Sequence, residues 1–153
     1  MSNAIDHICS LHSNPHIISP LLEVFYKHLA TKKNNILLSY LVFPLILSPT
    51  TMKKLKGSNK TSTLYTTFRD KRLIAGVQER VETYKKVTNN SLHIALKAGA
   101  IEVDTNQTVV FLEKKINSSS CSKDMIRATK NLAILLSSYE IVDCYRILGV
   151  KSL

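Results

Sequence analysis

The chain has 153 residues, of which 44% are hydrophobic, and a formal net charge of +10 at pH 7. This length allows one core that buries roughly two-thirds of the unfolded surface. The composition excludes a disordered chain, because it has four glycines, four prolines and no low-complexity tract. Cys9, Cys121 and Cys144 are too far apart for a zinc ribbon and odd in number, which excludes a disulfide framework.

The first residues form a polar segment that carries several side chains able to bind metal. His7, Cys9, His12 and His16 are ligand types for zinc, but their spacing does not match a structural zinc site. We therefore predict no metal and interpret residues 1–16 as an N-terminal arm, followed by a single domain over residues 17–153. The start also lacks the basic flank and apolar stretch of a secretory signal, so we expect a cytoplasmic protein.

The first predicted helix opens at Ser19, with Pro20 at its first helical position, and ends near Lys32. Leu21, Phe25 and Leu29 then share one face.

The next segment, Ile36 to Leu47, is a nearly unbroken apolar run of twelve residues. A membrane span needs about 20 apolar residues, and Pro44 interrupts this run, so we predict no membrane span. The run is either the central helix of a soluble core or a surface kept for another protein, and the sequence leaves both open. The candidate partner-facing residues are Leu38, Leu41, Phe43 and Leu45.

The positive charge is unevenly placed along the chain. Between Val24 and Arg69 there are eight basic residues and no acidic one. Such a distribution favours nucleic acid, an acidic protein or an anionic surface as a partner, and a solvated face is the alternative. The candidate contacts, which we call the basic belt, are Lys53, Lys54, Lys56, Lys60, Arg69, Lys71 and Arg72.

The middle of the chain predicts several helices. Ser48-Pro49 starts a short basic helix that reaches Lys56, before Gly57 ends it. One helical turn is expected over residues 63–68, and a longer apolar stripe over residues 73–86. Residues 89–99 then predict a separate short helix, with an Asn or Ser cap and Gly99 as its end.

A change of period to two follows that short helix. Ile101, Val103, Val109 and Phe111 alternate with polar neighbours and predict a β-hairpin. Two final helices are expected, one capped by Ser122 and one over residues 141–148 that Gly149 ends. The fold class is therefore mainly α (α+β), a helical domain with a winged-helix-like unit of helix plus β-hairpin.

A winged-helix unit suggests DNA recognition, which the charges of this unit do not favour. Between Leu92 and Leu112 the only basic residue is Lys97, against Glu102 and Asp104. Phosphate contacts depend mainly on Lys and Arg. Any DNA contact is therefore expected through the basic belt.

No motif indicates an enzyme. The eleven acidic residues show no metal-binding or paired arrangement, and Gly57-Ser58-Asn59-Lys60-Thr61 lacks the spacing of a phosphate-binding loop. We predict no catalytic residues, no cofactor and a role in binding.

Three stretches carry a family resemblance. Residues 35–47, from Asn35-Ile36-Leu37-Leu38 to Leu45-Ile46-Leu47, resemble the opening block of the middle components of bacterial three-component ABC systems. Ala95-Leu96-Lys97-Ala98-Gly99-Ala100-Ile101-Glu102-Val103 resembles their central helix-to-strand junction, and residues 128–150, which end in Leu148-Gly149-Val150, resemble their closing helix.

The resemblance implies a non-catalytic adaptor between an SMC- or Rad50-like ABC ATPase and an effector-linked subunit, in a bacterial defence system directed at invading DNA. DNA would be met through the complex, and we expect a homodimer or a bound partner. The alternative is a free-standing winged-helix transcriptional regulator that binds DNA.

Overall fold

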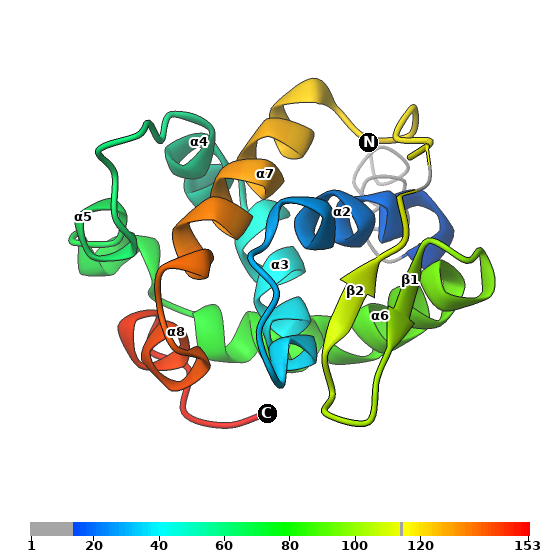
Figure 1. The fold of residues 1–153 in the computed structure, drawn as a ribbon. Helices are drawn as coiled ribbons and strands as arrows, with labels where there is room; N and C mark the ends of the chain where they lie inside the picture. Colours follow the sequence, from blue (N-terminus) through cyan, green and yellow to red (C-terminus); the bar gives the residue numbers. More distant parts are fainter. Residues whose placement is uncertain (1–13, 114) are drawn as a thin grey trace.

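The computed structural model describes residues 14–113 and 115–153 and is mainly helical, with one two-stranded antiparallel sheet (Figure 1). This confirms the predicted class of a helical domain with a β-hairpin. The α-helices are α2 (Pro15–His28), α3 (Ser39–Ile46), α4 (Pro49–Lys56), α5 (Leu64–Thr67), α6 (Val77–Lys97), α7 (Lys123–Ser137) and α8 (Ile141–Ile147). There are two 3-10 helices, η1 (Asn35–Leu38) and η2 (Lys71–Leu73), in the described residues. The two strands are β1 (Ile101–Val103) and β2 (Val109–Phe111).

Helix α2 begins earlier than the sequence indicated. The side chain of Asn14 accepts a hydrogen bond from His16 N at 3.0 Å, and Pro15 is the first helical residue. Ser19 and Pro20, the predicted cap and first position, are buried inside the helix, which ends at His28 rather than Lys32. The Asn14-Pro15 pair provides the same starting signal five residues earlier.

Helix α2 begins two residues before the end of the predicted N-terminal arm, residues 1–16. Pro15 and His16 are the first two residues of α2. Residues 1–13, which include His7, Cys9 and His12, lie outside the described residues.

The apolar run forms η1 and α3, which ends at Ile46, two residues after Pro44, as predicted. Helix α3 packs against α2, α4, α6 and α7 and lies inside the molecule (Figure 1). Ser48 and Pro49 then start α4, which ends at Lys56 as expected. Within the described chain no single helix is long and apolar enough to cross a membrane. The required length and apolar character are reached only when two segments, residues 35–46 and 49–56, are taken together, and these are bent by 106° relative to each other.

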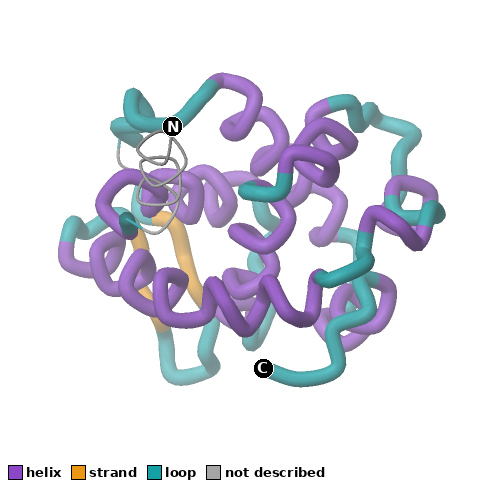
Figure 2. Tube along the Cα trace, turned by 180° about the vertical axis from the view of Figure 1, so that it is seen from behind, coloured by secondary structure: helices purple, strands orange, loops and turns teal. Residues whose placement is uncertain are grey.

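Helix α6 is one continuous helix of 21 residues, so the predicted separate helix over residues 89–99 is wrong. Asn89 and Asn90 are exposed mid-helix, where their low helix propensity favours a break. Burial of Val87, Leu92 and Ala95 continues the apolar stripe across that point and outweighs the propensity. Seen from behind, α6 runs along the lower part of the molecule (Figure 2).

The hairpin follows α6 directly, after Gly99 at a φ of 72° ends the helix. Its strands pair Ile101 with Phe111 and Val103 with Val109. Ile101 and Val109 are buried against the helices, as the alternation predicted. The winged-helix interpretation needed a separate short helix before the hairpin, and α6 does not provide one.

The C-terminal helices match their predicted signals. The Ser122 hydroxyl accepts a hydrogen bond from Met125 N at 3.1 Å and caps α7. Gly149 follows α8 at a φ of 73°. Helix α7 lies across α2 and packs on it (Figure 1).

Candidate partner and nucleic-acid interfaces

The four apolar residues expected to face a partner lie in the core instead. Leu38, Leu41, Phe43 and Leu45 are each 0% exposed and belong to the main hydrophobic cluster. Of the two interpretations of the apolar run, the structure therefore has the central core helix. The reason is that helices pack around α3 on several sides, which a sequence pattern cannot reveal.

The basic belt separates into several parts. Lys53 and Lys54 on α4 line one hollow of 590 Å³, together with Thr66 and Thr67 of α5. Lys60 lines a neighbouring hollow beside Lys130 of α7. These two hollows share Ser58, Asn59 and Ser62, so they adjoin.

The other members of the belt face elsewhere or are paired. Arg69 and Lys71 line a third hollow with Tyr65 and Arg146. Lys56 pairs with Asp124 of α7, with 3.3 Å between Nζ and Oδ2. The structure therefore brings Lys53, Lys54 and Lys60 to adjoining hollows and does not gather all seven residues in one site.

Arg72 is held by its neighbour Asp70. Its Nη2 lies 2.9 Å from Asp70 Oδ2, and its Nε lies 3.1 Å from Oδ1. These hydrogen bonds lower the pKa of Asp70, and the charge of Lys54 acts in the same direction. Because both side chains are exposed, the pair contributes little to stability. The carboxylate of Asp70 partly neutralises the charge that Arg72 could offer to an anionic partner.

An apolar groove that the sequence did not indicate lies beside α8. It has a volume of 630 Å³ and is lined by Leu37, Ile141, Val142, Tyr145 and the segment 149–153, with Arg146 and Lys151 among its polar members. Val142 is 68% exposed, and Leu37 and Leu153 are exposed as well. The i, i+3 spacing of Val142 and Tyr145 is a local signal for one helix face, but Leu37 joins this groove only through the fold.

Tyr145 connects this groove to the start of the apolar run. Its hydroxyl donates a hydrogen bond to the carbonyl oxygen of Leu37. Burial raises the pKa of Tyr145 well above its usual range, so the hydroxyl stays protonated and remains a donor. This hydrogen bond holds Leu37, which lines the groove, next to α8.

Over residues 14–113 and 115–153, no three His, Cys, Asp or Glu side chains converge to hold a metal ion. Cys144 is buried, and burial raises the pKa of its thiol to about 11. Burial also raises the pKa of Cys121, which is half-buried. Neither thiol has the lowered pKa of a reactive cysteine.

The comparisons with known proteins give one family. No curated protein and no solved structure matches the chain. The model of the family described as ABC-three component (ABC-3C) system Middle Component 3 matches residues 2–152, which is nearly the whole chain and includes the three stretches that carry the resemblance. The chain therefore belongs to the Middle Component 3 family of ABC-three component systems.

Proposed function

We propose that the protein is a non-catalytic adaptor that links an ABC ATPase to an effector-linked subunit in a defence system directed at DNA. Its membership of a middle-component family carries this proposal, since a component of a three-component system works with the others. The apolar groove beside α8 supports it, because exposed apolar side chains that share one hollow suit a protein partner.

The chemistry of the groove indicates what it would bind. Val142, Leu37 and Leu153 offer apolar surface, and Lys151 is an exposed cation among the lining residues. A segment of a co-encoded component that has apolar anchors flanked by acidic residues would match both features. The groove, rather than the buried face of α3, is thus the proposed protein contact.

The test is co-purification of the tagged protein with its co-encoded ABC ATPase and effector-linked subunit. We expect the wild-type chain to retain at least one of them. Val142→Asp should lower the retained amount by about tenfold or more, because it places a charge in a desolvated apolar contact. Ile134→Asp is the matched control, since Ile134 is also exposed, at 51%, but lies on α7 away from the groove.

Two results would overturn the proposal. One is a wild-type chain that retains neither co-encoded component and is a strictly monodisperse monomer by light scattering. The other is equal loss of binding in Val142→Asp and Ile134→Asp, which would remove the groove as the contact. A homodimer seen by light scattering would assign the groove to a second copy if Val142→Asp dissociated it.

The alternative role, a free-standing regulator that reads DNA through the hairpin unit, has less support from the geometry. His93 and Lys97 are exposed on α6, but the neighbouring strand and turn expose Glu102 and Asp104. Carboxylates at this position would be repelled by backbone phosphate. Binding of the isolated protein to a specific promoter sequence would favour this role over the adaptor.

A further inference from the structure

A second basic surface lies between α2 and α7, on residues outside the basic belt. Its hollow of 660 Å³, which we call the basic groove, has Lys, Arg and His side chains from three segments that are far apart in the sequence. Lys27 and His28 come from the end of α2, Lys115 from the segment after β2, and three from α7. The α7 cations are Lys123, Arg127 and Lys130.

The charge of the basic groove is unbalanced. The residues that line it include no carboxylate. All five Lys and Arg side chains are exposed, and within the described residues none of them forms a salt bridge. The acids nearest in sequence are Glu23, Glu113 and Asp124, and Asp124 is paired with Lys56. Five unpaired cations around one hollow create a positive potential that a polyanion would relieve.

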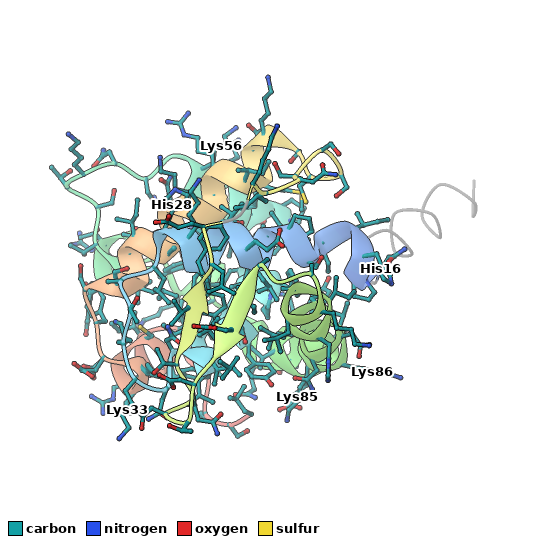
Figure 3. The ribbon with its side chains drawn as sticks, turned by 45° about the vertical axis from the view of Figure 1, so that its right-hand side comes forward. His16, His28, Lys33, Lys56, Lys85 and Lys86 are labelled. Carbon is teal, nitrogen blue, oxygen red and sulfur yellow. The ribbon has the colours of Figure 1, made fainter. Side chains whose placement is uncertain are left out.

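His28 adds an imidazole ring in a fixed orientation to the basic groove. Its Nδ1–H donates to the carbonyl oxygen of Val24 at 2.9 Å, which fixes the ring at the end of α2. Figure 3 shows His28 at this end of the helix. Its ring therefore has a fixed place beside the exposed cations of the groove.

The groove continues toward the basic belt. Lys130 also lines the hollow that contains Lys60. That hollow in turn adjoins the one lined by Lys53 and Lys54. Lys130 therefore lies between the basic groove and the hollows of the basic belt, and cations on α2, α7 and α4 line neighbouring hollows. Cations spread over several hollows suit a repeating anion better than a single phosphate group.

The other lining residues indicate how such an anion is read. They are the aliphatic Val24, Ile116 and Ile126 and the small Ser118, so His28 is the only aromatic side chain among the described residues that line the groove. Single-stranded nucleic acid is held largely by stacking of successive bases on several aromatic side chains, and one histidine ring does not form such a platform. Lys and Arg on phosphates, without groups placed to read base edges, produce binding that does not depend on sequence.

We propose that the basic groove binds the phosphate backbone of a nucleic-acid duplex, independently of base sequence, with Lys27, Lys115, Lys123, Arg127 and Lys130 as the contacts. This site is distinct from the apolar groove and does not depend on the adaptor role. If each of the five cations neutralises one phosphate, log affinity should fall with log salt at a slope of about −4.5 for duplex DNA.

The experiment measures fluorescence anisotropy of a labelled 20-base-pair duplex with the purified full chain at several salt concentrations. The variant is Lys123→Glu with Arg127→Glu. We expect its affinity to fall about tenfold or more and its salt slope to decrease to about −2.7, since two contacts are lost. Glu at position 123 begins α7, where the helix dipole favours negative charge, so the fold should be retained.

Lys85→Glu with Lys86→Glu is the matched control. It changes the net charge by the same amount but lies on α6, away from the groove (Figure 3). We expect this control to bind within about threefold of wild type. Equal losses in both double variants would overturn the proposal, because net charge alone would then explain binding.

Three further arms specify the ligand. Duplexes of unrelated sequence should bind equally, and a strong preference for one sequence would contradict backbone recognition. The affinities for DNA and RNA duplexes are compared directly, and the duplex that binds more tightly is assigned as the ligand. If a polyglutamate peptide binds through Lys123 and Arg127 while no duplex binds, the groove is a site for an acidic protein and the proposal fails.

Discussion

Asn35 is a buried side chain that joins the start of the apolar run to the hairpin. Its Nδ2 donates to the carbonyl oxygen of Val109 at 3.0 Å, and its Oδ1 accepts from Val109 N at 2.6 Å. Its own carbonyl oxygen accepts a hydrogen bond from the Tyr26 hydroxyl at 3.1 Å. One amide therefore acts as an extra strand residue at the edge of β2 and satisfies backbone groups that water does not reach.

Asn35→Ala should destabilise the protein strongly. It leaves the N–H and C=O of Val109 without partners at a buried position, and each such group costs about 1 to 3 kcal/mol. Urea denaturation followed by circular dichroism measures the loss. Asn34→Gly is the control, because Asn34 is exposed with a φ of 61°, where glycine fits without strain. Equal stability of Asn35→Ala and wild type would show that the amide does not hold β2.

Cys144 should resist alkylation in the folded protein. It is buried, and its pKa of about 11 leaves roughly one thiolate in a thousand at pH 8. Iodoacetamide treatment followed by peptide mass mapping should show an unmodified Cys144 in buffer and a modified one in denaturant. Modification at the same rate in both conditions would contradict the burial of this helix face.

At the scale of elements, Lys32 connects the end of α2 to the end of α7. Its Nζ donates to the carbonyl oxygens of Leu136 at 3.1 Å, Ser137 at 3.3 Å and Tyr139 at 2.5 Å. The last carbonyls of a helix lack partners within it, and a cation there also meets the negative end of the helix dipole. Lys32 is thus a structural cation rather than part of a binding surface.

Lys32→Met keeps the aliphatic stem and removes the charge and the donors. We expect a loss of about 1 to 3 kcal/mol, as for hydrogen bonds to a charged group. Lys33→Met is the matched control, since Lys33 is exposed and points away from the fold (Figure 3), and should change stability by less than about 0.5 kcal/mol. Thermal melts of both variants give the comparison, and equal melting temperatures would remove the capping role.

At the scale of the whole molecule, α3 determines whether the chain has one core. Leu41→Ala should cost about 2 to 5 kcal/mol, because a fully buried leucine leaves a cavity that surrounding helices cannot all close. Leu37→Ala in the apolar groove should cost far less, since Leu37 is exposed. Chemical denaturation measures the free energy of unfolding of both variants. A small effect of Leu41→Ala would contradict the position of α3 in the core and favour a partner surface.

Local signals in the sequence determined most of the elements. The caps at Ser48 and Ser122 and the endings at Gly99 and Gly149 depend on the backbone preferences of a few neighbouring residues. The alternation around the hairpin needs only the period of a strand. The family resemblance also came from contiguous stretches, and the match over residues 2–152 confirmed it.

Only the tertiary structure decided where surfaces lie. An apolar run has the same pattern whether it faces a core or a partner, and four helices packed around α3 made it a core. The spacing of Lys123, Arg127 and Lys130 in the sequence predicts that they share one helix face. That Lys27 and Lys115 lie close to them depends on how α7 packs on α2. Charge and burial at a surface are sums over segments distant in the chain, so they follow from packing and not from local preference.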